Sequence, residues 1–128
     1  MTAKLVWPAL VLAFSTLAPL TLQPAAALPD FDALQEQGAS RTRASNLARM
    51  QAERLNGGLD LYRAEACMSE GGGGSCFIGS QNGGLLFRFR GGPPGWQQLG
   101  LPANLETEIL VAADGRQVLE VIYNGPPR

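Results

Sequence analysis

The sequence predicts an α+β domain in which one amphipathic helix packs on an antiparallel sheet of four or five short strands. Three observations predict this fold class. Apolar residues recur every three or four positions over residues 41–56, as on one face of a helix. After Gly58, short runs of alternating apolar and polar residues are separated by glycine and proline. The last two runs are joined by Asp114-Gly115, which is typical of a tight hairpin turn.

The predicted helix covers residues 41–56 and is preceded by a flexible leader, residues 28–40. Ser40 is the expected N-cap, because a serine oxygen can accept a hydrogen bond from a free backbone N–H in the first turn. Asn56 and the two glycines after it are expected to end the helix. The face that packs on the sheet is expected to contain Ala44, Leu47, Ala48, Gln51 and Leu55.

The third of five predicted strands, residues 85–90, has the clearest alternation of side chains. Leu85, Phe87 and Phe89 fall on one face, which should be core, whereas Leu86, Arg88 and Arg90 fall on the other and should meet solvent. Gly91 to Gly95, with two prolines among them, should end this strand. The predicted strands are residues 59–67, 76–80, 85–90, 106–112 and 117–123.

In the final hairpin, one apolar face is expected on each arm. Thr107, Ile109 and Val111 form it on the first arm, and Leu119, Val121 and Tyr123 form it on the second. The opposite face carries glutamates that can make cross-strand ion pairs with Arg88 and Arg90, each worth roughly 0.2 to 1 kcal/mol. These glutamates are Glu106, Glu108 and Glu120.

Residues 1–27 read as a cleavable signal peptide. Lys4 supplies a positive charge, residues 5–22 carry no ionisable side chain, and Ala25 to Ala27 fit a small-residue cleavage site that leaves Leu28 first. The alternative is a retained membrane anchor, since the apolar stretch is near the roughly 20 residues that span a bilayer. Prolines in and after the stretch favour cleavage. The mature chain is then a single domain, residues 41–124, with a short tail, residues 125–128, in the periplasm or outside the cell.

Charge excludes some partners. Cleavage would remove Lys4, the only lysine, and leave nine arginines against eleven acidic residues. A chain this close to neutral lacks the clustered positive charge that nucleic acids and anionic membrane surfaces require. We therefore expect no nucleic-acid partner, and no membrane association after signal cleavage.

Cys67 and Cys76 are the only cysteines, and a disulfide is their expected state in an oxidising compartment. Their spacing differs from that of a thioredoxin-type redox pair, which has two residues between the cysteines. In a chain without histidine, two thiols cannot complete a usual zinc site without carboxylates, so no metal and no cofactor are expected. The glycines between the cysteines, Gly71 to Gly74, favour a flexible linker over a phosphate loop because no Lys-Ser/Thr pair follows them.

Parts of the chain resemble two known groups of proteins. The stretch "ETEILVAADGRQVLEVIYNG" resembles the final hairpin of PepSY-type modules, and cystatin-like domains share the general outline of a helix on a sheet. The segments "LNGGLDLYRAEACM", "LLFRFRGGPPGW" and "VIYNGPPR" resemble an uncharacterised group of small exported bacterial proteins. The second resemblance implies export and one compact domain, and neither implies an activity.

Two surface features are candidate binding sites. Trp96 follows a proline-stiffened turn, where a rigid aromatic ring could anchor a partner or stack on a sugar, or could instead fold back and cap the core. Arg88 and Arg90 lie on one strand face and could bind a carboxylate or phosphate group through paired hydrogen bonds, or could pair with the glutamates named above.

The expected function is an exported, non-catalytic binding or accessory module of the cell envelope, whose partner is an envelope protein, a peptide or a glycan. The chain has no histidine, and its only lysine lies in the signal segment, so the usual general bases and nucleophiles are missing. The alternative is a small carboxylate-dependent hydrolase in which two of the strand glutamates act on a glycosidic bond.

Overall fold

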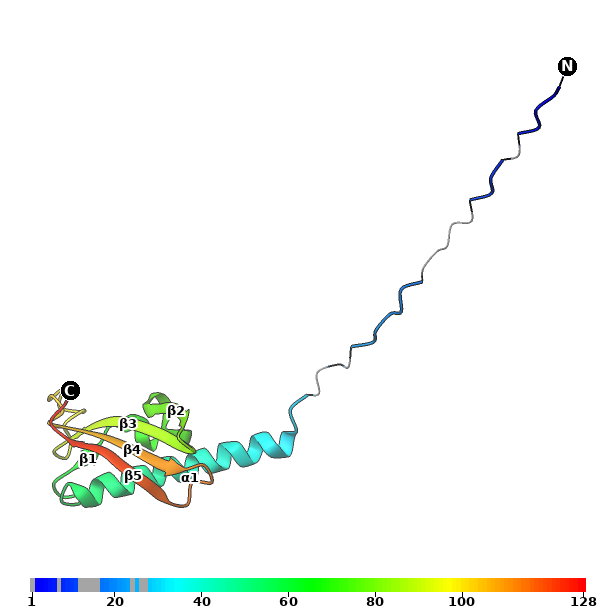
Figure 1. Ribbon diagram of the computed structural model, residues 1–128. Coiled ribbons are helices and arrows are strands. Elements are labelled where there is room, and N and C mark those ends of the chain that lie inside the picture. The colour runs from blue at the N-terminus through cyan, green and yellow to red at the C-terminus, as the bar shows by residue number, and fades with distance from the viewer. Residues whose placement is uncertain (1, 7, 12–16, 24, 26–27) are drawn as a thin grey trace.

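The fold is that of a computed structural model, which describes residues 2–6, 8–11, 17–23, 25 and 28–128 (Figure 1). One long helix packs against an open antiparallel sheet of five strands, so the predicted α+β fold class is confirmed. The elements in chain order are α1 (Phe31–Leu55), β1 (Arg63–Ala64), the 3₁₀ segments η1 (Ala66–Ser69) and η2 (Gly71–Cys76), β2 (Phe77–Gln81), β3 (Gly84–Gly92), β4 (Leu105–Ala112) and β5 (Val118–Gly125).

The predicted signal segment is only partly described. Its described residues form neither helix nor strand, and they extend away from the domain (Figure 1). Ala26 and Ala27 of the expected cleavage site lie outside the described residues. Within the part of the chain that the structure describes, no helix is both long and apolar enough to cross a membrane.

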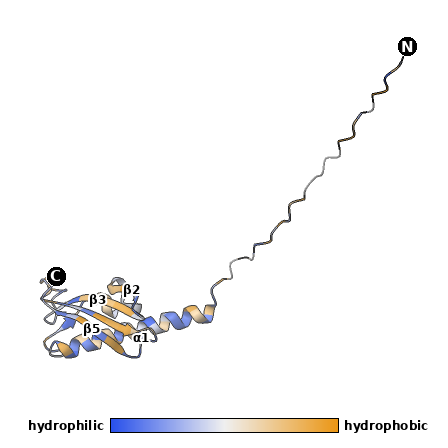
Figure 2. Ribbon diagram, viewed as in Figure 1, coloured by the Kyte–Doolittle hydropathy of each residue, from blue (hydrophilic) through white to orange (hydrophobic). Residues whose placement is uncertain are grey.

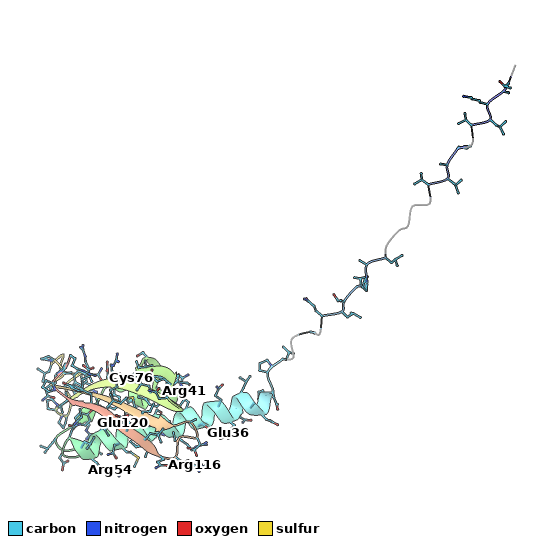
Figure 3. The ribbon with its side chains drawn as sticks, in the orientation of Figure 1. Glu36, Arg41, Arg54, Cys76, Arg116 and Glu120 are labelled. Carbon is cyan, nitrogen blue, oxygen red and sulfur yellow. A yellow bond between two sulfur atoms is a disulfide. The ribbon has the colours of Figure 1, made fainter. Side chains whose placement is uncertain are left out.

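Helix α1 begins ten residues earlier than predicted. Its N-cap is Asp30, whose carboxylate accepts a hydrogen bond from the Asp32 backbone N–H, so Ser40 lies inside the helix and is not the cap. Most of the predicted flexible leader is therefore helical. Residues 31–39 are exposed on all sides and protrude beyond the sheet, with Glu36 on this protruding part (Figure 3).

The end of α1 and its packing face agree with the prediction in most respects. Asn56 is the C-cap, and the two glycines that follow have positive φ angles, which stop the helix. Ala44 and Ala48 are completely buried on the sheet, as expected, whereas Leu55 is 46% exposed and takes no part in this face. Small side chains let the helix approach the sheet closely; the buried residues are Ser40, Ala44, Ser45, Ala48 and Ala52.

Strand β3 is the centre of the sheet. It pairs with β4 on one side, and on the other side with both β1 and β2, while β5 continues the sheet beyond β4 and forms its edge. The predicted first strand, residues 59–67, is wrong in length, because only Arg63 and Ala64 pair with β3, opposite Gly92 and Gly91. Beyond Ala64 the chain turns into η1, which contains Cys67.

The face of the sheet that packs on α1 holds the core, and its strand residues are more apolar than the protruding helix (Figure 2). Phe87 and Phe89 are buried there as predicted. Leu86 was expected to meet solvent, but this part of the prediction is wrong: Leu86 is 2% exposed, and Leu110, directly across from it on the face away from α1, is 5% exposed. The core also contains Tyr62, Met68, Ile109 and Val111.

Strand β5 contains two irregularities that change which side chains share a face. The pairing with β4 skips Leu119 and Ile122, so that Val118 and Val121 lie opposite Val111 and Ile109, while Tyr123 lies opposite Glu108. The prediction that Leu119, Val121 and Tyr123 share one face is therefore wrong, since each bulge adds a residue and reverses the alternation. Tyr123 is placed on the face away from α1.

The glycine segment between the cysteines is ordered and does not act as a flexible linker. Gly72 and Gly73 are buried against α1 and the core and have φ angles of +69° and +84°, a conformation that other residues rarely adopt. The Gly72 carbonyl accepts a hydrogen bond from Arg41 Nε at 2.9 Å. Arg41 also lies over the Phe77 ring, 4.2 Å from its centroid. The segment is thereby fastened to the helix.

Candidate functional site

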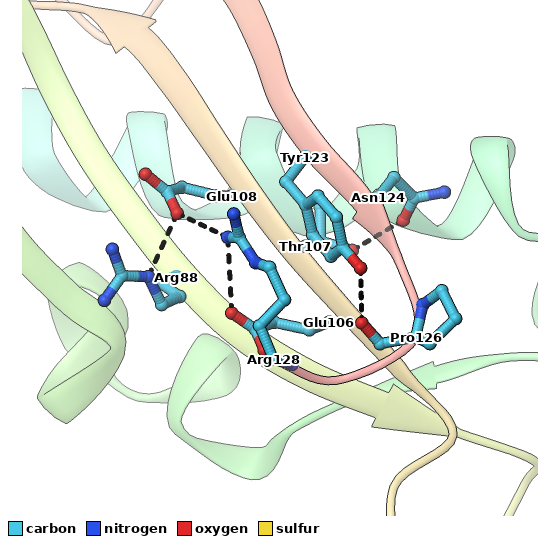
Figure 4. Close-up of polar contacts among 8 residues, drawn as sticks. All are labelled: Arg88, Glu106, Thr107, Glu108, Tyr123, Asn124, Pro126 and Arg128. Atoms are coloured by element: carbon cyan, nitrogen blue, oxygen red, sulfur yellow. Dashed lines mark hydrogen bonds and ion pairs between the residues drawn. The ribbon is translucent and has the colours of Figure 1, made fainter.

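The face of the sheet away from α1, called the outer face here, carries a cluster of charged residues. Arg88 and Glu108 lie directly opposite each other on β3 and β4, as do Arg90 and Glu106. Figure 4 shows the side chains of this face in front of the sheet, with the helix behind it. The strand alternation that buries Phe87 and Phe89 on the inner face places both arginines here.

One of the predicted cross-strand ion pairs forms as expected. Arg88 Nε donates to Glu108 Oε2 at 3.0 Å. Arg90 lies across from Glu106 but makes no ion pair within the described residues, and neither does Glu120. The free guanidinium of Arg90 and the unused terminal nitrogens of Arg88 are thus both available on the same strand face.

Sequence reasoning missed Arg128 and Tyr123. Arg128 Nη2 donates to Glu108 Oε2 at 2.8 Å and to Glu106 Oε1 at 3.4 Å, and the Arg128 backbone N–H donates to Glu106 Oε2 at 2.8 Å. The Tyr123 ring lies 3.7 Å from the Arg128 guanidinium carbon, and its hydroxyl donates to the Pro126 carbonyl (Figure 4). The bulges in β5 and the reversal of the tail bring these groups together, and no periodicity in the sequence signals either event.

A polar pocket of about 350 Å³ opens on the outer face beside these charges. One of its lining residues is Glu65, whose Oε2 accepts a hydrogen bond from the Arg90 backbone N–H at 3.0 Å. Three arginines and two glutamates line it together, so it suits a small charged group better than an apolar one. The lining residues are Glu65, Arg88, Phe89, Arg90, Glu106 and Arg128.

Trp96 lies at the end of the same face but is buried. The indole packs over Gly92, where a side-chain carbon would come within 2.9 Å of it, and Trp96 is only 8% exposed. Its Nε1 donates to the Arg63 carbonyl at 3.0 Å. Trp96 is therefore folded back onto the domain as a cap, which is one of the two roles considered for it. An exposed aromatic anchor at this position is ruled out.

A second pocket, of about 390 Å³, lies beside Trp96 between the β1–η1 segment and the turn at residues 94–98. Gln97, one of its lining residues, accepts a hydrogen bond from the Ala66 backbone N–H at 2.7 Å and so ties the two walls together. The pocket contains no carboxylate, so it lacks the acid pair that the hydrolase alternative requires.

The disulfide between Cys67 and Cys76 is present, with the two Cα atoms 5.8 Å apart. Glu65 lies next to it, and the Glu65 carboxylate and the two sulfurs lie within 4.8 Å of one another. Both sulfurs are bonded to each other, so they are not thiolates that could ligate a metal. This group is therefore part of the covalent framework of the domain.

Glu106 and Glu108 are 5% and 8% exposed, and both are paired with arginine. Burial raises the pKa of Glu108, but hydrogen bonds from Arg88 and Arg128 outweigh it and hold that pKa below its usual value of 4.5. A glycosidase acid needs the opposite shift, because it must carry a proton at neutral pH. The arrangement holds Glu108 ionised and favours charge pairing over acid catalysis.

The lowered pKa of Glu108 predicts a loss of stability in acid. Folding favours the ionised form of Glu108. Its contribution to the stability of the folded protein is therefore complete above about pH 4.5, the usual pKa, and is lost as the pH falls through the lower pKa that Glu108 has in the folded state. Between about pH 6 and about pH 3, the melting temperature should fall less steeply for Glu108→Gln than for the unmodified protein. Glu120→Gln, at an exposed position, is the matched control, and an equal slope for Glu108→Gln and the unmodified protein would contradict the assignment.

Comparisons with known proteins give no relative for this chain. No family model, no curated protein and no solved structure matches it. The resemblances to PepSY-type hairpins and to a group of small exported proteins are not tested by this outcome and stay predictions.

Proposed function

We propose that the protein is an exported, non-catalytic binding module of the cell envelope, and that its partner is a protein or peptide that presents a carboxylate to Arg88 and Arg90. The observation that carries this proposal is the guanidinium of Arg90, which makes no ion pair within the described residues and lies beside Arg88 at an open polar pocket. Arginine forks bind carboxylates through two parallel hydrogen bonds, which gives geometric selectivity as well as affinity.

The two arginines have different roles in this proposal. Arg88 is oriented by its bond to Glu108, so little side-chain freedom is lost when a ligand binds its remaining nitrogens. Arg90 has no ion pair to break within the described residues, so its charge is available at once. Together they offer a partly preorganised site on a rigid strand.

Export is supported by the N-terminal pattern and by the disulfide, which persists in oxidising compartments. The mass of the protein recovered from the envelope fraction of its own cell tests this part. We expect a mature chain that begins at about Leu28 and contains no free thiol. A full-length chain in the cytosol with both cysteines reduced would contradict export.

Partner binding is tested by capture from the same envelope fraction with the disulfide-intact mature domain. Arg90→Ala should weaken the affinity for the captured partner at least about tenfold while leaving the melting temperature unchanged, because no ion pair is lost. Arg88→Ala combined with Arg90→Ala should abolish capture. Arg54→Ala, a change at an exposed arginine on α1, is the matched control. Unchanged affinity in the Arg90 variant would remove this surface from the proposal.

A further inference from the structure

The two glutamates of β4 require positive charge close to them. The side chains of Glu106 and Glu108 are 7% and 11% exposed, and a buried carboxylate without a partner is strongly destabilising. Arg88 compensates Glu108 from the neighbouring strand. Glu106 faces Arg90 in the ladder, yet within the described residues its ion pair is with Arg128. The negative charge of Glu106 is therefore neutralised by Arg128, which lies beyond the end of β5.

The site around the Arg128 side chain has the shape that a guanidinium requires. The flat cation lies against the Tyr123 ring at 3.7 Å, and one of its nitrogens reaches both carboxylates, at 2.8 and 3.4 Å. A planar, delocalised cation can stack on a ring and bond at its edge at the same time, whereas the ammonium of lysine is a compact point charge. Glu106, Glu108 and Tyr123 are called the cradle below.

The cradle and its occupant are held differently. The three cradle residues lie on paired strands, β4 and β5. Within the described part of the chain, residues 126–128 have no backbone–backbone hydrogen bond, and they are attached through Glu106, Glu108 and the Tyr123 hydroxyl. The Arg128 side chain is 47% exposed, so water and solutes reach it. Release of Arg128 would break no backbone hydrogen bond of β4 or β5, but it would leave the Glu106 carboxylate without its ion pair.

We propose that the cradle is a guanidinium-binding site that Arg128 occupies in cis, and that an arginine side chain of a partner occupies it when Arg128 is released. Pro126 and Pro127 restrict the tail, which keeps Arg128 at a high local concentration beside the cradle. A partner arginine therefore competes poorly while Arg128 is bound. This site adjoins Arg88 and Arg90 of the proposed function in the same outer-face pocket, but it binds a cation instead of a carboxylate and uses side chains of β4 and β5.

The test uses N-acetyl-arginine amide as the probe and the chemical shifts of Glu106, Glu108 and Tyr123 as the readout. Arg128→Ala should bind the probe saturably, with a dissociation constant in the range of about 1 to 10 mM and at least about tenfold tighter than the unmodified protein. N-acetyl-lysine amide at the same ionic strength should bind several-fold more weakly than the arginine probe. Adding Glu106→Gln to Arg128→Ala should abolish the response.

Three outcomes would overturn the inference: equal affinity in the unmodified protein and Arg128→Ala, equal affinity for the arginine and lysine probes, or no saturable shift in a folded Arg128→Ala protein. If Arg128→Ala does not fold, Arg128→Lys retains a positive charge near Glu106, and the same three comparisons apply to it. Arg90→Ala, which tests the proposed function, removes a positive charge across from Glu106 and should not weaken probe binding, so the two proposals can fail separately.

Discussion

Trp96→Ala is expected to lower the free energy of unfolding by about 3 kcal/mol, the low end of the usual range for removing a buried tryptophan. The low end applies because Trp96 caps the outer face at Gly92 and lies outside the main core. Two contributions are lost, the apolar contact area of the indole and its hydrogen bond to the Arg63 carbonyl. Urea unfolding of the mature domain measures the change.

Trp96→Phe separates these two contributions. A phenylalanine keeps most of the apolar contact but cannot donate to the Arg63 carbonyl, so the loss should be nearer 1 kcal/mol. A change below about 1 kcal/mol in Trp96→Ala would contradict the role of Trp96 as a buried cap.

Loss of the Cys67–Cys76 disulfide should lower the free energy of unfolding by about 2 to 3 kcal/mol, which the chain-entropy description gives for a loop this short. The bond joins η1 and η2 in a region where both cysteines are buried. Without it, the chain between β1 and β2 gains freedom in the unfolded state. Urea unfolding of the oxidised and the reduced protein should show the difference.

The control for this experiment is the double variant Cys67→Ala and Cys76→Ala. Its unfolding should not respond to a reducing agent, and its stability should be close to that of the reduced protein. Unfolding curves that coincide for the oxidised and the fully reduced protein, with two free thiols confirmed in the latter, would show that the η2 packing and not the bond holds this region.

The sequence predicted those parts of the fold whose signal lies within a few neighbouring residues. The alternation in residues 85–90 gave the inner and outer faces of β3, and Asp114-Gly115 marked the turn between β4 and β5. The pairing of Arg88 with Glu108 followed from alternation on two adjacent strands. In each case the signal lies within a few residues, and tertiary packing agrees with it.

The errors arose where a second local signal competed with the one chosen, or where the folded sheet interrupts a pattern. The helix begins at Phe31 because Asp30 caps it as well as Ser40 could, and nothing in residues 31–39 prevents helix formation strongly enough. The skipped residues of β5 reversed the expected faces, since a bulge leaves no mark on a simple alternation count. Arg128 reaches the site by a reversal of the tail, which depends on contacts with β4 that only the folded sheet provides.

The bulges of β5 have a further consequence for solubility. β5 ends the sheet, so one row of its backbone groups has no ladder partner, and Leu119 and Ile122 are 46% and 39% exposed. A flat, apolar border strand of this length would be a template on which other chains could add strands and aggregate. Two interruptions within eight residues distort that border, so an incoming strand cannot keep a continuous register along it.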